Sequence, residues 1–151
     1  MVALDLDGTL LDYSPEGPYP RFNFGILSLL CSGGGERSVA ILTNQGGLPF
    51  GVMGAVRRDG RPYPTPEQFV GRLQFACCEL RRYGVYVVAL RVSLYHAKAP
   101  AAAVQTAAQQ VRDLVRQAGI TRETRRVESR GFGNTTVYTT ARARKPQPLM
   151  L

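Results

Sequence analysis

Residues 2–12 have the sequence VALDLDGTLLD, in which a short apolar run meets two acids and a glycine. The segment Val2–Leu6 is too short for a helix and is followed by Gly8, so it predicts a buried β-strand. Asp5 and Asp7 then lie where that strand ends. Because ligand sites of open α/β sheets form at the carboxyl ends of strands, both acids are candidate site residues.

Two further apolar segments, Ser38–Thr43 and Val85–Val92, predict central parallel strands, and the β-branched segment Thr135–Ala141 is a candidate fourth strand. Helices are expected between the strands, at residues 22–31, 66–83 and 101–118. This alternation predicts an α/β fold, with a parallel sheet and helices on its faces, in one domain that spans residues 1–151.

Signals for helix ends are clearest around the second expected helix. Thr65 is a candidate N-cap, Pro66 stands at the first helical position, and Gly84 is expected to end the helix. The last expected helix has Gly119 as its stop. Residues 46–64 are rich in glycine and proline, so they are predicted to form a loop or a small insertion over the end of the sheet.

The composition is that of a globular protein, with 44% hydrophobic residues in a chain of 151. No apolar run reaches the roughly 18–20 residues that span a bilayer, and acids interrupt the early apolar segment. Neither a membrane span nor a signal peptide is predicted, and the expected location is the cytoplasm. The three cysteines show no metal-binding spacing, which argues against a zinc knuckle or a disulfide framework.

The net charge of +8 comes almost entirely from arginine, because Lys98 and Lys145 are the two lysines. Guanidinium groups match phosphate geometry, and a basic surface attracts polyanions through counterion release. Basic residues are concentrated between Arg112 and Lys145. Two interpretations stay open: a polyanion-binding face, or an arginine content that reflects genome composition or thermal adaptation.

Polar side chains follow the predicted strands. Paired carboxylates at one strand end favour a hard cation with oxygen ligands, such as Mg²⁺. One carboxylate of such a pair can act as a nucleophile and its neighbour as acid and base. Thr43 and Asn44 follow the second strand and Lys145 lies beyond the last, and hydroxyl and ammonium donors suit phosphoryl oxygens. These residues predict phosphoryl chemistry at the strand ends.

Three motifs together resemble those of the haloacid dehalogenase-like (HAD) phosphohydrolases: DLDGTLLD (5–12), ILTNQGG (41–47) and RKPQPLM (144–150). The TNQ and RKP forms are similar to those of polynucleotide 3′-phosphatases and of histidinol-phosphate and heptose-bisphosphate phosphatases. The resemblance implies a three-layer, Rossmann-like parallel sheet with helices on both faces. It also implies a Mg²⁺-dependent phosphomonoesterase.

By the same resemblance, Asp5 is the expected nucleophile and forms an aspartyl-phosphate, while Asp7 protonates the leaving oxygen and later activates water. Asp5 and the Asp7 carbonyl are the expected Mg²⁺ ligands. Thr43 is expected to bind a phosphoryl oxygen, and Lys145 to neutralise charge on the intermediate. Further substrate contacts are expected from Gly8, Thr9, Asn44 and Arg144.

The chain departs from the family pattern in two places. No acidic pair that resembles the fourth motif follows Lys145, so the chain looks C-terminally truncated. A partner chain or a further segment is then expected to complete the metal site. The zinc-loop cysteines of the sugar-phosphate relatives are also missing, and His96 alone cannot hold structural zinc. The second departure favours the polynucleotide relatives.

Nucleic-acid 3′-phosphate ends are therefore the preferred substrate. Arg57, Arg58 and Arg61 are expected to line a groove for a phosphodiester backbone, with the ring of Tyr63 stacking on a base; a solvated loop is the alternative. Two alternatives stay open for the whole chain: a phosphatase of small sugar or amino-alcohol phosphates, and a non-catalytic or partner-completed HAD-like domain. Steep salt dependence would distinguish nucleic acid from the small substrates.

Overall fold

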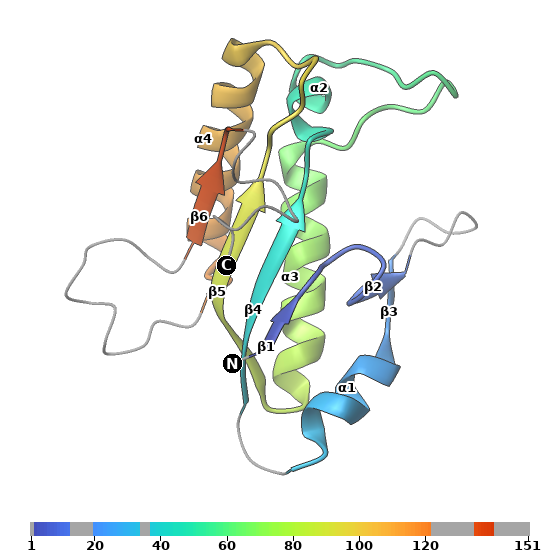
Figure 1. Cartoon of the computed structure of the whole chain (residues 1–151), viewed down its shortest axis with the longest axis vertical. Helices are drawn as coiled ribbons and strands as arrows, with labels where there is room; N and C mark the ends of the chain where they lie inside the picture. Colours follow the sequence, from blue (N-terminus) through green and yellow to red (C-terminus); the bar gives the residue numbers. More distant parts are fainter. Residues whose placement is uncertain (1, 13–19, 34–36, 122–134, 141–151) are drawn as a thin grey trace, which may run out of the picture.

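Four parallel strands form the central sheet of the computed structural model, which describes residues 2–12, 20–33, 37–121 and 135–140 (Figure 1). The strand order is β1-β4-β5-β6, with β1 at one edge. The strands are β1 (Val2–Leu4), β4 (Arg37–Asn44), β5 (Val85–Ser93) and β6 (Thr135–Tyr138). The predicted α/β fold with a parallel sheet is confirmed at this level.

The register of the sheet brings the strand ends together. Leu4 pairs with Ile41 in the parallel ladder between β1 and β4, and Asn44 pairs with Ser93 between β4 and β5. All four strands run in the same direction, so their carboxyl ends point the same way, and β1 ends before its neighbour β4 does (Figure 1). A separate antiparallel pair, β2 (Leu11–Asp12) and β3 (Arg21–Phe22), follows the turn after β1.

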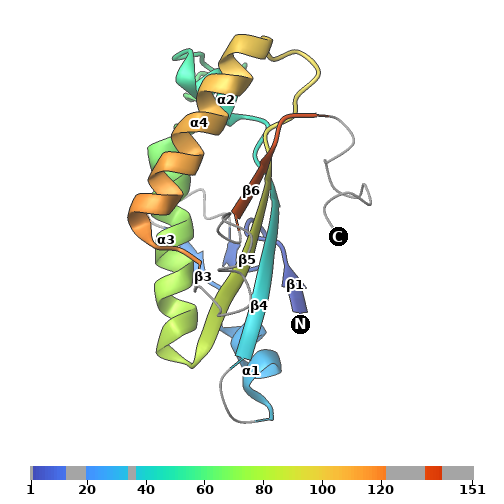
Figure 2. The same ribbon diagram turned by 90° about the vertical axis from the view of Figure 1, so that its left-hand side faces the viewer.

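Two long helices, α3 (Pro66–Arg82) and α4 (Ala101–Ala118), pack side by side on one face of the sheet (Figure 2). Their buried side chains share one core with α1 (Phe24–Cys31) and with the inward-facing residues of the strands. A smaller apolar cluster of Ala40 and Leu42 has Ala89 and Tyr138 packed against it. Helices on both faces were expected, but within the described ranges α3 and α4 cover the same face.

Helix boundaries follow the capping signals in the sequence. Thr65 caps α3 with a complete capping box, in which its hydroxyl accepts from the Gln68 amide and the Gln68 side chain accepts from the Thr65 amide. Gly119 ends α4 in the left-handed conformation that glycine adopts without strain. α1 begins later than predicted, because Phe22 pairs in β3 and Asn23 is the N-cap.

The segment 46–64 is more ordered than the predicted loop. It contains a short helix, α2 (Leu48–Val52), followed by a hairpin closed by an antiparallel bridge between Val56 and Pro62. The fourth strand, in contrast, is shorter than predicted and ends at Tyr138. None of the helices in the described part of the chain is long and apolar enough to cross a membrane.

Candidate active site

A tight turn after β1 holds the two acids. The Leu6 carbonyl accepts from the amides of Leu10 and Leu11, and the Gly8 amide donates to the Leu11 carbonyl over 2.7 Å. Gly8 has φ +78°, a conformation that side chains other than glycine rarely adopt. Leu6 is fully buried, whereas Asp5 and Asp7 on either side of it in the sequence are half-buried.

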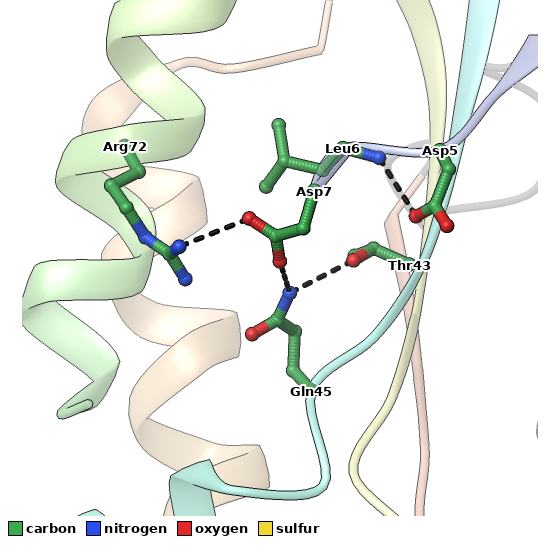
Figure 3. Close-up of polar contacts among 6 residues, drawn as sticks. All are labelled: Asp5, Leu6, Asp7, Thr43, Gln45 and Arg72. Atoms are coloured by element: carbon green, nitrogen blue, oxygen red, sulfur yellow. Dashed lines mark hydrogen bonds and ion pairs between the residues drawn. The ribbon is translucent and has the colours of Figure 1, made fainter. Parts of the chain in front are cut away.

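One amide group connects the ends of β1 and β4. Gln45 Nε2 donates to Asp7 Oδ2 over 2.6 Å and to Thr43 Oγ1 over 2.9 Å (Figure 3). The carboxylate can only accept, which fixes the amide nitrogen of Gln45 on this side. The Thr43 hydroxyl therefore accepts from Gln45, and its own proton is directed elsewhere. Thr43 and Gln45 are buried, with 1% and 6% of their surface exposed.

Arg72 brings a cation to the same carboxylate from helix α3. Its Nη1 lies 3.0 Å from Asp7 Oδ1, and the Asp7 and Arg72 side chains are 13% and 26% exposed. Both oxygens of Asp7 are thus engaged by donors (Figure 3). Arg72 was not among the site residues predicted from the sequence. The available signal was its helical phase, because it lies one turn from both Phe69 and Ala76 on the buried side of α3.

The two acids occupy different environments. The Asp7 side chain points toward α3 and Arg72, whereas the Asp5 carboxylate lies beside the strands (Figure 3). Asp5 Oδ1 accepts from the Leu6 amide over 2.8 Å, which holds the carboxylate close to its own backbone. A pair of carboxylates in unlike surroundings can divide two roles, one as nucleophile and one as proton carrier.

The structure brings together part of the predicted site. Asp5, Asp7 and Thr43 meet at the strand ends, and Gly8 and Thr9 lie in the turn after the acids. Asn44 ends β4 beside Ser93, whose buried hydroxyl has no hydrogen-bond partner among the described residues. Arg57 and Arg58 lie apart from this group, on the exposed hairpin. The predicted residues Arg144 and Lys145 lie outside the described residues.

A row of rings joins that hairpin to the segment after β4. Tyr63 stacks on Phe50 of α2 with ring centroids 4.9 Å apart, and the Arg57 guanidinium lies 5.3 Å from the centre of the Tyr63 ring. Phe50 also meets the edge of His96 at 4.9 Å. Tyr63 was expected to stack on a base, but Phe50 and Arg57 already contact its ring. The tyrosine therefore supports the hairpin.

His96 lies on the loop that follows β5. A methyl group at Gly46 would contact its side chain, so His96 packs beside the segment that carries Gln45. His96 Nδ1 accepts from the Lys98 amide over 3.2 Å, which leaves the proton of a neutral imidazole on Nε2. His96 thus has a structural contact in the row of rings.

The donors at the strand ends are suited to a hard cation that keeps much of its water. Among the described residues, no three His, Cys, Asp or Glu side chains are grouped to hold a metal ion. The Asp5 carboxylate and the Asp7 carbonyl are oxygen donors, and Mg²⁺ is often bound through one or two carboxylates with several waters. The residues present therefore fit Mg²⁺ as a partial ligand set.

Comparisons of this chain with protein-family models, with curated proteins and with solved structures found no match. The arrangement of Asp5, Asp7, Thr43, Gln45 and Arg72 is therefore the basis on which a function can be proposed for this chain.

Proposed function

We propose that this chain is a Mg²⁺-dependent phosphomonoesterase that acts through an aspartyl-phosphate on Asp5. The observation that supports the proposal most directly is the amide of Gln45, which ties Asp7 at the end of β1 to Thr43 at the end of β4. Two acids, a hydroxyl and a guanidinium then meet at the carboxyl end of a parallel sheet, where α/β proteins bind their ligands. The hydroxyl and the guanidinium are donors of the kind that stabilise charge in phosphoryl transfer, and a carboxylate can act as the nucleophile.

In the proposed reaction, a carboxylate oxygen of Asp5 forms a bond to phosphorus while the bond from phosphorus to the ester oxygen breaks. Asp7 enters this step protonated, and the leaving oxygen takes that proton. Water then attacks the aspartyl-phosphate and gives a proton to Asp7, phosphate leaves, and the Asp5 carboxylate is restored. Asp7 can exchange protons only if its contact with Gln45 or Arg72 opens, because donors occupy both of its oxygens.

Charge repulsion is the main obstacle to this reaction, because an anionic carboxylate attacks an anionic phosphate. Mg²⁺ held by Asp5 and the Asp7 carbonyl would supply positive charge against the phosphoryl oxygens. Asp7 carries no charge while it is protonated, and Arg72 pairs with it when it is ionised, so one of the two acids adds little repulsion. The Thr43 hydroxyl has a proton to donate to a phosphoryl oxygen, and Lys145 is proposed to add a second cation.

For the substrate we propose nucleic-acid 3′-phosphate ends, supported by the net charge of +8 and its origin in arginine. Small sugar or amino-alcohol phosphates are the alternative. Kinetics separate the two, because only a polyanionic substrate should lose kcat/KM steeply as salt is added.

The decisive test compares phosphate release by the wild-type chain, Asp5→Asn and Asp12→Asn, with an aryl phosphate as substrate. Asp12 is an exposed acid in β2, so its variant has the same change of charge outside the site. We expect wild type and Asp12→Asn to release phosphate with Mg²⁺ and to stop with EDTA, while Asp5→Asn is inactive. Equal release by all three proteins, or none by the wild type, would rule out the proposed catalysis.

A further inference from the structure

The hairpin between α2 and α3 is an ordered projection at the carboxyl end of the sheet (Figure 1). Its turn is closed by hydrogen bonds from the Arg57 amide to the Arg61 carbonyl, 2.7 Å, and from the Gly60 amide to the Arg57 carbonyl, 2.9 Å. Gly60 has φ +83°, which suits glycine. The backbone of the tip therefore has a defined conformation, which fixes the positions from which its side chains extend.

Three exposed arginines occupy this tip. Arg57, Arg58 and Arg61 project from it, and the one acid among them, Asp59, accepts the Arg61 amide over 3.1 Å. Beside them, Met53 and Val56 are 47% and 60% exposed. The hairpin thus combines guanidinium groups with exposed apolar side chains, an arrangement that contributes nothing to the core.

The base of the hairpin is fixed to the candidate site. Tyr63 stacks on Phe50, Phe50 contacts His96, and His96 packs beside Gly46, which directly follows Gln45. A ligand that contacted the hairpin would therefore be held at a constant position relative to Asp7. The hairpin is thus suited to bind a part of a large substrate that lies away from the reacting phosphate.

We propose that the Arg57–Arg61 hairpin binds the phosphodiester backbone of single-stranded nucleic acid. Guanidinium groups form paired hydrogen bonds with phosphate oxygens, and exposed apolar side chains can contact the faces of unpaired bases, which a duplex keeps stacked inside. The choice of nucleic acid rests on the proposed function, because a strand that ends in a phosphate at Asp5 carries further phosphates along its length.

Binding of a fluorescent single-stranded oligonucleotide with a 3′-hydroxyl end tests the proposal, because this probe is not a substrate. The variant Arg58→Gln/Arg61→Gln removes two exposed charges whose side chains form no hydrogen bond or ion pair with the residues that the structure describes. The matched control, Arg82→Gln/Arg116→Gln, removes two exposed charges at the far ends of α3 and α4. Affinity is measured by anisotropy over a range of KCl concentrations.

We expect the hairpin variant to bind more weakly and to reduce the slope of log K against log salt by about 1.4, at about 0.7 per phosphate contact on a single strand. The control should keep the wild-type slope. An equal loss of affinity in both variants, or no loss in either variant, would overturn the proposal. So would competition by polyglutamate as strong as that by unlabelled oligonucleotide, since the hairpin would then favour an acidic protein partner.

The same experiment separates this proposal from the proposed catalysis. Hairpin-dependent binding without any Asp5-dependent release of phosphate supports the docking surface and overturns the phosphatase. Suppose instead that phosphate release depends on Asp5, but oligonucleotide binding is unchanged in the hairpin variant. That result supports the phosphatase and overturns the docking surface.

Discussion

Asp7 is the residue on which the candidate site converges. Its carboxylate receives Gln45 from the segment after β4 and Arg72 from α3, so its position depends on two other elements. Two donors on one partly buried carboxylate fix its orientation, and an acid–base group contributes to a reaction only when its orientation is right. In the proposed mechanism, Arg72 is therefore a positioning residue that acts through Asp7.

Replacing Arg72 tests that role. We expect Arg72→Gln to lower kcat by about tenfold to a hundredfold, less than the full ~10²–10⁴ contribution of an acid–base group, because Asp7 remains but is less well oriented. KM should change little. Arg72→Lys should recover part of the rate, since an ammonium keeps the charge but not the planar fork. Steady-state kinetics with the aryl phosphate measure both constants.

Arg82→Gln is the matched control, because it removes an exposed arginine that pairs with Glu79 on the same helix. Its kinetics should equal those of the wild type. A rise in KM for Arg72→Gln at unchanged kcat would show instead that Arg72 binds the substrate directly.

The three cysteines should differ sharply in reactivity. Burial raises the pKa of the Cys77 thiol to about 12, whereas Cys31 and Cys78 are exposed. Because the thiolate is the reactive form, a disulfide reagent at mildly alkaline pH should modify two thiols in the native protein and the third only after unfolding. Rapid modification of all three in the native state would contradict the buried position of Cys77.

The pKa of Cys77 also predicts a loss of stability at alkaline pH. In the unfolded chain a cysteine thiol ionises near pH 8.5, but the native Cys77 stays protonated up to about 12. Unfolding therefore releases a proton between these values, so the free energy of unfolding falls as pH rises through this window. Cys77→Ala should remove this part of the pH dependence in urea unfolding, and Cys78→Ala should keep it.

At the scale of elements, α2 and the residue before the N-cap of α3 approach so closely that one position in α2, Gly51, requires glycine. A methyl group added to Gly51 would overlap the carbonyl group of Pro64, and backbone atoms cannot move aside as a flexible side chain can. This contact fixes the position of the N-terminus of α3 relative to α2. It thereby fixes the placement of Arg72, less than two turns further along the helix.

Alanine at two glycines should have opposite effects on stability. Gly51→Ala should cost about 1–3 kcal/mol through overpacking. Gly71→Ala should stabilise by about 0.5–1 kcal/mol, because Gly71 lies inside α3 with open space where its methyl group would be. Thermal denaturation measures both changes, and a kcal/mol corresponds to about 2–4 °C for a chain of this size. A Gly51→Ala variant as stable as wild type would disprove the close approach.

At the scale of the molecule, the sequence predicted the elements whose signals are local. The cap at Thr65, the stop at Gly119 and the apolar runs of β4 and β5 depend on neighbouring residues, and all appear where expected. The predicted start of α1 at Phe22 was wrong, because the pairing of Phe22 with Leu11 depends on a strand elsewhere in the chain. The hairpin in 46–64 was missed because its glycines and prolines resemble those of a plain loop.

The site was predicted in part for the same physical reason. Asp5, Asp7 and Thr43 were found because strand ends can be located from the sequence and parallel strands align those ends. Arg72 was missed because its contact with Asp7 joins α3 to the turn after β1 across 65 residues of chain. Gln45 follows Thr43 directly in the chain, yet its hydrogen bond to Asp7 depends on the register of β1 against β4.

The network around Asp7 also has a consequence for the order of events in folding. Gln45 lies 38 residues from Asp7 and Arg72 lies 65 residues from it, so the network joins three distant parts of the chain. Closing such long loops is costly before the native contacts form, and parallel strands cannot pair locally. The orientation of Asp7 should therefore arise late in refolding, after α3 and α4 have gained their helical structure.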